Sequence, residues 1–429
     1  MEKDEGILFL LRCAKVLQPE EPLAQATSEQ QTNAEAIVNV LDGLPLALDQ
    51  AGAYIEETGC SLPEYLTFYQ AHKKELLRKR GSLSTHYPES VATTWSLSFQ
   101  QIEQNSLPAA DLLRVCAFLD PDAIPEEMLV EGATHLGPSL ASTVTDPFQL
   151  AELVQHLNKF SLVQRNAEQK FLRIHRLVQA VLRDEMTQET QKTWAERVVY
   201  AVNEAYPADV DVNTRSKCER YLPHALICTI LLDQYRLAFL EAARLFHKVG
   251  LYVEFYMANV KFTLVEPLYV HALDIKEQVL GPTHSDTADT LHVLAQFYHQ
   301  QHQYAQAEPL YRRALSIREN VEGPNSKTAD TIQSLAELYH QQHQYAQAEP
   351  LYLRALSIRE QLEPTSALER LVRLDLHSTL HHLGFLYKDL GQYERAKAMF
   401  NRCTDFLDRN HPDWEIAIEY YDWLCKKLH

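Results

Sequence analysis

Apolar and small residues recur with a fixed spacing in the second half of the chain. Residues 298–319 are repeated at 339–360 with one difference, Arg312 in the first copy and Leu353 in the second. Such near-identity indicates a tandem duplication. In each unit the spacing predicts two short helices, with large side chains on one face and small ones where the helices cross. In the first copy these positions are Leu291, Leu294, Ala295, Tyr298, Tyr304, Ala307, Tyr311 and Ala314.

The same spacing recurs in other parts of the chain. It returns at Ile332, Leu335, Ala336, Tyr339, Tyr345, Ala348, Tyr352 and Ala355, in a diverged unit at Leu380, Leu383, Gly384, Tyr387, Tyr393, Ala396 and Phe400, and in part at 266–272. This arrangement resembles the tetratricopeptide repeat. Its period is longer than the usual one of about 34 residues, as in the repeats of kinesin light chain and of many bacterial regulatory proteins. Three to four units are enough for a solenoid core.

The first 84 residues predict a small helical bundle. Helical apolar spacing covers Ala34–Leu41, Pro45–Glu57 and Leu62–Arg80. Prolines stand near the start of the second and third helices, and basic residues end the third, as helix termini prefer.

Residues 85–190 predict a second helical domain that ends in a β-hairpin. The pattern gives helices at Pro108–Leu119, from Pro125 and at Gln149–Lys159, then strands at Ser161–Arg165 and Phe171–His175, then a helix at Arg176–Met186. Three helices followed by a hairpin is the order of a winged helix. Residues 191–245 are expected to be a helical connector and 246–429 the repeat array. The predicted fold class is all-α with one small β-hairpin.

Composition and charge support helix and argue against several functions. Only 12 of 429 residues are Gly, less than half the usual share of about 7%. The net charge of −18 disfavours non-specific binding to nucleic acid or anionic membrane, and it also serves solubility. The candidate DNA-reading segment, Phe148–Phe160, carries one Lys or Arg, Lys159. Scattered cysteines and the lack of a long apolar run lead us to expect a soluble cytoplasmic protein.

Four motifs in a fixed order carry a broader resemblance. They are Gly43-Leu-Pro-Leu-Ala-Leu48, Cys116-Ala-Phe-Leu119, Leu172-Arg-Ile-His-Arg-Leu-Val178 and Tyr221-Leu-Pro-His-Ala-Leu226, ahead of the repeats. Together they resemble a bacterial NB-ARC regulatory ATPase of the STAND class. The resemblance implies that residues 1–80 match the helical lid after a nucleotide-binding domain and residues 85–190 its winged helix.

The resemblance also implies two ligand-binding residues. Pro45 would pack against the adenine and ribose of ADP, and His175 would contact its β-phosphate. The family more often has an acidic residue where Arg176 stands. Two alternatives stay open: Pro45 is simply a residue that starts a helix, and His175 is a histidine satisfied in the core.

The loop that would hold the phosphates of ATP is missing from this sequence. A Walker loop needs Gly-x-x-x-x-Gly-Lys-Ser/Thr, and the nearest spacing, Gly132–Ser139, has Pro138 in the lysine position. We therefore expect that the chain begins after the ATPase domain, is not an enzyme by itself, and binds no cofactor alone. ADP or ATP would bind only with a nucleotide-binding domain supplied in cis or in trans.

Paired histidines at His299/His302 and His340/His343 have a spacing that zinc accepts, but further ligands are not apparent. We expect these histidines to be solvated loop residues and expect no metal. Nothing in the sequence marks a nucleophile or a catalytic acid pair.

The first helix of each repeat is expected to line a concave groove that binds a protein or peptide. The inward positions are Asp289, His292, Gln296, His299, Gln300, Asp330, Gln333, Glu337, His340 and Gln341, with Ser378, His381, Phe385, Lys388 and Asp389 in the last unit. This groove would be polar and mildly acidic, which favours a polar or basic guest. Alternatively, these positions are merely solvated. The preferred function is the regulatory and sensor portion of a STAND protein, and the alternative is an autonomous repeat adaptor.

Overall fold

The computed structural model describes residues 2–78, 91–160, 162–257, 261–362 and 369–404. The chain forms two compact units, Met1–Leu237 and Ala238–His429. Each unit is described by itself.

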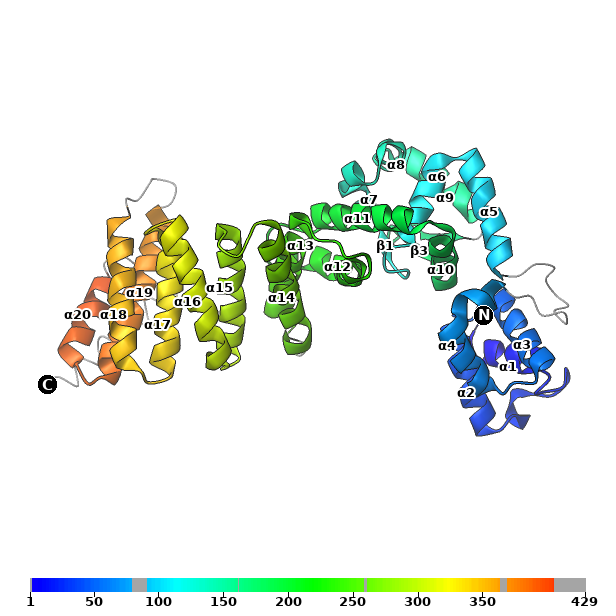
Figure 1. The fold of residues 1–429 in the computed structure, drawn as a ribbon, viewed down its shortest axis with the longest axis horizontal. Helices are drawn as coiled ribbons and strands as arrows, with labels where there is room; N and C mark the ends of the chain where they lie inside the picture. The colour runs from blue at the N-terminus through cyan, green and yellow to red at the C-terminus, as the bar shows by residue number, and fades with distance from the viewer. Residues whose placement is uncertain (1, 79–90, 161, 258–260, 363–368, 405–429) are drawn as a thin grey trace. The chain divides into compact units, whose positions relative to one another are not determined.

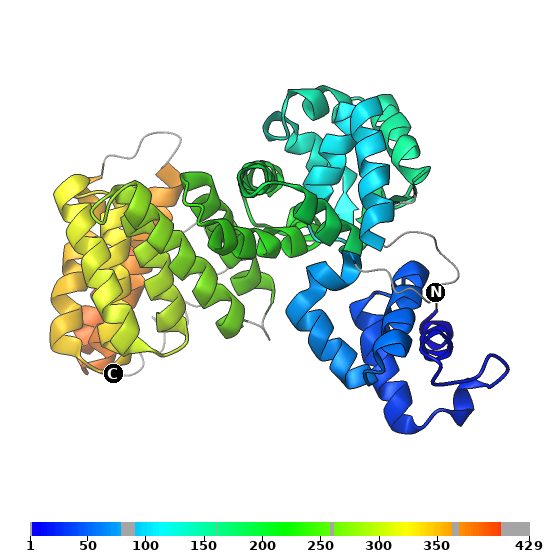
Figure 2. The same ribbon diagram turned by 45° about the vertical axis from the view of Figure 1, so that its right-hand side comes forward.

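The first unit begins with a bundle of helices (Figures 1 and 2). They are α1 (Lys3–Cys13), the short η1 (Leu23–Gln25), α2 (Ser28–Val40), α3 (Pro45–Thr58) and α4 (Leu62–Arg78). The core of the bundle includes the fully buried Leu10, Leu11 and Leu48. α1 and α3 pack so closely that a Cβ on Gly52 would lie 2.3 Å from that of Cys13, so only Gly fits there. The predicted bundle is therefore present, with α1 added to the expected helices.

The unit continues with helices around a small sheet. The elements are α5 (Val91–Asn105), α6 (Leu107–Cys116), β1 (Ile124–Pro125), α7 (Glu126–Glu131), η2 (Ala133–His135), α8 (Pro138–Val144), α9 (Pro147–Asn158), β2 (Val163–Asn166), β3 (Phe171–Ile174) and α10 (Arg176–Glu185). The strand order is β1-β3-β2 and both pairings are antiparallel, with Val163 opposite Ile174 and Ile124 opposite Leu172.

The sheet has one strand more than the sequence pattern predicts. β1 is only two residues long and contains Pro125, which the pattern marks as the start of a helix. A proline is tolerated because β1 is an edge strand, where a missing N–H costs no ladder bond on the open side. The fold class is all-α with a small sheet, as expected.

Two long helices, α11 (Gln188–Ala205) and α12 (Arg215–Tyr235), complete the first unit. The division between the units follows Leu237. The expected boundary between connector and array, at 245/246, instead falls inside α13 (Leu240–Tyr256), because α13 is the first helix of a repeat.

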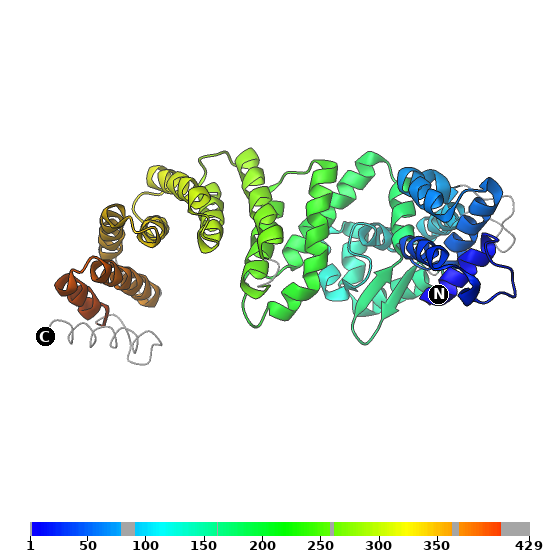
Figure 3. The same cartoon turned by 90° about the horizontal axis from the view of Figure 1, so that it is seen from below.

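The second unit is a row of antiparallel helix pairs, seen end-on in Figure 3. The pairs are α13 with α14 (Lys261–Val279), α15 (Ser285–Gln300) with α16 (Tyr304–Val321), α17 (Ser326–Gln341) with α18 (Tyr345–Gln361), and α19 (Glu369–Asp389) with α20 (Tyr393–Thr404). Prolines 267, 309 and 350 lie in the second helix of their pairs.

In the first and last pairs, a glycine on the first helix faces an aromatic ring on the second. A Cβ on Gly250 would lie 2.4 Å from the Tyr269 ring, and one on Gly384 would lie 2.6 Å from the Phe400 ring. The 41-residue offset puts Ala295 and Ala336 at the matching positions of the two middle pairs, and both are fully buried. Helix crossing thus limits side-chain size at this position.

Replacing Ala295 with Leu should overpack the crossing in the second pair. We expect a loss of about 1–3 kcal/mol in unfolding free energy, measured by denaturant titration. Gln296→Arg, one position along on the groove side, is the control and should change stability by about 0.5 kcal/mol or less. Equal losses in both variants would show that the crossing is not size-limited.

Candidate functional site

Pro45 and His175, which lie far apart in the sequence, line one cavity in the first unit. The cavity measures about 800 Å³, and we refer to it as the Pro45–His175 cavity. Its walls come from the turn before α3, from α5, from the hairpin and from the start of α10. The lining residues are Asp42, Gly43, Leu44, Pro45, Leu46, Trp95, Leu162, Gln164, Arg173, His175 and Val178.

Pro45 stands at the first position of α3, where its missing N–H is not needed. The chain reaches it through a turn in which Asp42 (φ 54°) and Gly43 (φ 62°) are both left-handed. Leu44 is the N-cap residue and has no side-chain bond to the helix. The first turn of α3 therefore brings backbone N–H groups without a capping side chain to the cavity wall.

His175 is the N-cap residue of α10. Its Nδ1 accepts a hydrogen bond from the backbone N–H of Leu177 at 3.2 Å, and its ring lies 6.1 Å from that of Trp95 between centroids. Its Nε2 lies 3.4 Å from Oδ2 of Asp42 and has no hydrogen-bond partner. Burial lowers the pKa of His175, and the Asp42 carboxylate partly opposes that shift.

Two arginines and an aspartate lie beside His175. Arg173 and Arg176 donate to the two carboxylate oxygens of Asp122, at 3.2 and 2.8 Å. Burial would raise the pKa of Asp122, but the hydrogen bonds and charges of Arg176 and Arg173 outweigh it and lower that pKa. Of the two arginines, Arg173 lines the cavity. Arg176, which departs from the family pattern, is bound to Asp122 instead.

These residues fit one wall of a nucleotide site. The buried Nε2 of His175 lacks a hydrogen-bond partner, the start of α3 has no side-chain cap, and Arg173 supplies positive charge. Pro45 and Trp95 offer apolar surface for a base or sugar. This sequence contains no Gly-x-x-x-x-Gly-Lys-Ser/Thr loop.

A second candidate site lies in the repeats, where five of the ten predicted groove residues surround one cavity. These five are Gln296, His299, Gln300, Glu337 and Gln341, and they share a cavity of about 230 Å³ with His302, Tyr311 and Ser334. Nε2 of His299 lies 3.1 Å from Oε1 of Gln341, which joins α15 to α17. We refer to this site as the groove cavity.

The other predicted groove residues make contacts within the repeats. Asp289 accepts from Arg318 and Lys327, both at 2.7 Å, and Asp330 pairs with Arg359 at 2.5 Å. His292 is buried against the ring of Tyr311, Gln333 bonds Ser378 and Thr379, and His340 bonds Asp389 at 3.0 Å.

The expectation that these residues face a partner stays a prediction. Asp289, His292, Asp330 and Gln333 serve the junctions between helices. The sequence did not reveal these contacts, because an arginine near the end of a helix is normally a surface residue. The one indication in the sequence was that both near-identical copies carry this arginine, as Arg318 and Arg359.

The prediction for the paired histidines needs correction. His299 lies in α15 and His340 in α17, where each ring packs against tyrosines. His302 and His343 are the turn residues, both with φ 59°. Each helix extends further than expected because the sharp turn is made by the second histidine of the pair. Within the described ranges, no three His, Cys, Asp or Glu side chains are grouped to hold a metal ion.

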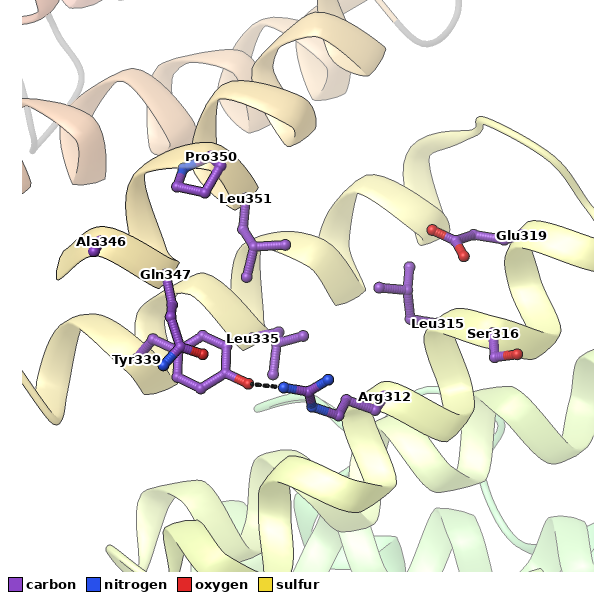
Figure 4. Close-up of a pocket in the computed structure, with 10 residues that line it drawn as sticks. All are labelled: Arg312, Leu315, Ser316, Glu319, Leu335, Tyr339, Ala346, Gln347, Pro350 and Leu351. Atoms are coloured by element: carbon purple, nitrogen blue, oxygen red, sulfur yellow. Dashed lines mark hydrogen bonds between the residues drawn. The ribbon is translucent and has the colours of Figure 1, made fainter. Parts of the chain in front are cut away.

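A further cavity of about 500 Å³ lies between α16, α17 and α18 (Figure 4). Leu315, Leu335 and Leu351 form its apolar part. At its edge Arg312 donates to the Tyr339 hydroxyl at 2.7 Å, and its Nε donates to Glu308 at 2.9 Å. The one residue that differs between the two copies thus braces this junction.

Family comparisons match two parts of the chain. Tetratricopeptide repeat models match residues 250–320, 286–361 and 377–406, and a domain of unknown function, DUF7779, matches residues 100–191. The chain carries tetratricopeptide repeats, which are a scaffold for protein interaction. The second match spans the sheet and its surrounding helices.

One curated relative is a nucleotide-binding leucine-rich repeat (NLR)-like protein of Hyaloscypha variabilis. It is 25% identical over 274 residues, which are 61% of this chain and 26% of the relative. The chain thus spans about a quarter of that protein's length.

Two solved structures are also similar. BtubC from P. vanneervenii is 19% identical with a TM-score of 0.34, covering 66% of this chain and 87% of that one. Nearly identical TPR-like repeats from Podosopora anserina, described as kinesin light chain, are 18% identical with a TM-score of 0.35. They cover 45% of this chain and 92% of the other. Among the described helices, none is both long and apolar enough to cross a membrane.

Buried histidines should make the repeats sensitive to acid. Burial lowers the pKa of His292 to about 3 and that of His247 to about 4, with Arg318 and Lys276 adding to the respective shifts. Because the folded pKa lies below the unfolded value near 6.5, the unfolded chain binds more protons between these values. Stability is therefore full above about pH 6.5 and falls as pH drops toward 4.

His292→Gln should reduce this loss between pH 7 and pH 5 by about 1 kcal/mol, measured by urea unfolding at both pH values. Gln is the residue at the matching position of the next repeat, Gln333. Leu294→Ala is the control, because it should lower stability by a similar amount at both pH values. A pH dependence unchanged in His292→Gln would show that His292 does not contribute.

Proposed function

We propose that the chain is the regulatory and sensor portion of a STAND-type signalling protein. The observation that carries the proposal is the convergence of Pro45 and His175 on one cavity. The similarity to an NLR-like protein, which is named as nucleotide-binding, supports the switch part of the proposal. The tetratricopeptide repeats support the sensor part, because they are a binding scaffold. The helices and sheet of residues 91–185 would be its winged-helix domain.

In this proposal the Pro45–His175 cavity contributes one wall of an ADP-holding site, and a nucleotide-binding domain supplies the other in cis or in trans. Bound ADP would supply negative charge on its phosphates. The N–H of His175 would donate to a phosphate oxygen, Arg173 would add positive charge, and Pro45 would pack against the base and ribose. No residue here is proposed to hydrolyse a nucleotide, and we expect no ATPase activity from the chain alone.

The repeats would bind a polar or basic protein segment at the groove cavity. Gln296, Gln300 and Gln341 offer amide groups that pair with an extended backbone, and Glu337 offers a carboxylate to a cationic side chain. Glu337 already accepts from Gln333 at 2.8 Å and lies 3.2 Å from His382. A basic partner would therefore meet a carboxylate that is already oriented.

A second candidate function is an autonomous adaptor that scaffolds partners without nucleotide. The tetratricopeptide repeats, which are a scaffold for protein interaction, favour it. A titration of ADP into the chain, alone and with a nucleotide-binding domain, separates the two. Only the switch proposal requires ADP to bind more tightly when the domain and the chain are together.

His175→Ala should weaken ADP retention in a protein that joins the chain to a nucleotide-binding domain. Loss of one charge-assisted hydrogen bond corresponds to about 1.5–3 kcal/mol, or roughly a 10- to 150-fold faster release of ADP. Release is measured by displacement of a fluorescent ADP analogue. Glu168→Gln, at the exposed tip of the β2–β3 turn and outside the cavity, is the control. Unchanged release in His175→Ala would return His175 to a structural role.

Gln296→Arg should impair capture of a basic partner and leave the fold intact. The substitution places a cation beside Glu337 in the groove cavity, so like charges would repel a Lys- or Arg-rich segment. Affinity is measured with wild-type and variant chains against the same partner, at matched thermal stability. Arg312→Leu, which copies the residue of the second repeat, is the control away from the groove cavity. Equal affinity in Gln296→Arg would exclude this face as the binding surface.

A further inference from the structure

The hydrogen bonding of His175 fixes where its proton lies. Nδ1 accepts from the N–H of Leu177, so it must carry a lone pair. The neutral ring therefore holds its proton on Nε2, which is the atom turned toward Asp42. His175 thus presents one N–H donor, and that donor can serve one anion at a time.

Asp42 now stands where that anion would be. At 3.4 Å its carboxylate attracts the imidazole by charge but is too distant for a strong hydrogen bond. The position is held by the turn rather than by the contact, because Asp42 has φ 54° and the N–H of Gly43 donates to Val38 at 2.9 Å. Aspartate tolerates this left-handed backbone better than most residues do.

The charges around His175 come from each element that packs on it. The turn before α3 brings Asp42, β3 brings Arg173, and α10 brings Arg176; Trp95 of α5 is uncharged. Asp122 pairs with both arginines, which leaves one net positive charge on the three groups. Asp42 is the one acidic side chain among the cavity-lining residues, and it faces Nε2 of His175, a buried donor with no hydrogen-bond partner.

We propose that Asp42 is an internal anion for His175 and that a phosphate group must displace it to bind there. This inference rests on the proposed function in assigning phosphate to the cavity. Asp42 then determines which anions the site accepts. A singly charged anion carries the same charge as the Asp42 carboxylate that it would displace. The exchange therefore brings it little binding free energy. A diphosphate brings more charge and more acceptor oxygens, so it gains from the exchange.

The test uses the full chain, with inorganic pyrophosphate and ADP as separate probes. The His175 imidazole is followed by ¹H–¹⁵N NMR during pH and ligand titrations, and its signals are assigned by their loss in His175→Gln. Asp42→Asn removes the charge and suits the same backbone. Asp42→Gly is a second variant that also suits a positive φ. Glu168→Gln, at the exposed tip of the β2–β3 turn, removes one carboxylate elsewhere and is the control.

Both Asp42 variants should lower the pKa of His175 and bind pyrophosphate about five- to tenfold more tightly than wild type, while Glu168→Gln behaves as wild type. Three results would overturn the proposal. These are an unchanged His175 pKa in the Asp42 variants, an affinity for pyrophosphate that is unchanged, weaker or absent, or an effect in only one of the two variants.

Failure of the proposed function gives a different result. If ADP retention in the protein joined to a nucleotide-binding domain does not depend on His175, the switch proposal fails. The Asp42 proposal would still stand if pyrophosphate shifts the His175 signals and the Asp42 variants strengthen that binding. Conversely, His175-dependent ADP retention without any effect of Asp42 would leave the switch and remove the internal anion.

Discussion

A buried guanidinium group fixes how each of the two middle repeats meets the next. Arg318 is 3% exposed and contacts Asp289 of its own repeat as well as the Lys327 carbonyl and the Thr331 hydroxyl of the following one. Arg359 repeats this set with Asp330, the Asp375 carbonyl and Thr379, and at the preceding junction Lys276 bonds the Asp286 carbonyl. A charge buried this deeply is costly unless every partner is in place, so the helices must keep this register.

The same constraint separates the side chains that hold the junctions from those that line the groove cavity. Asp289 and Asp330 form ion pairs with the two guanidinium groups. Gln296, Glu337 and their neighbours lie further along the helices, around the groove cavity. Besides the Arg312 contact, the histidine contact differs between junctions: His299 contacts Gln341 at the first junction, and His340 contacts Asp389 at the next. The side chain that this histidine contacts therefore changes from a neutral amide to a carboxylate, although the backbone repeats. This difference distinguishes one junction of the repetitive scaffold from the next.

The sequence predicted the repeats well because two independent features indicate them, the near-identical duplication and the regular spacing of apolar residues. It did not reveal that Arg318 is buried, since an arginine near a helix end has the same local pattern whether it faces water or a neighbour. β1 was missed because two residues are too few to show alternation and one of them is Pro125. The resemblance named Pro45 and His175 separately. Only the fold shows that they share a cavity and that the carboxylate of Asp42, in the turn before α3, lies 3.4 Å from the His175 imidazole.

Helix α10 gives His175 a physical connection to the N-terminal bundle. His175 caps the helix, while Leu177 and Val181 on its first turns are buried in the bundle core. A rearrangement that carried α10 away from the bundle would expose both side chains, at about 1.5–3 kcal/mol each. An anion that binds His175 shifts the equilibrium between the packed and separated positions of α10 only if it binds one of them more tightly than the other. In the proposed switch, a ligand would therefore have to favour one arrangement by a similar total, about 3–6 kcal/mol, which is more than a single hydrogen bond to His175 supplies.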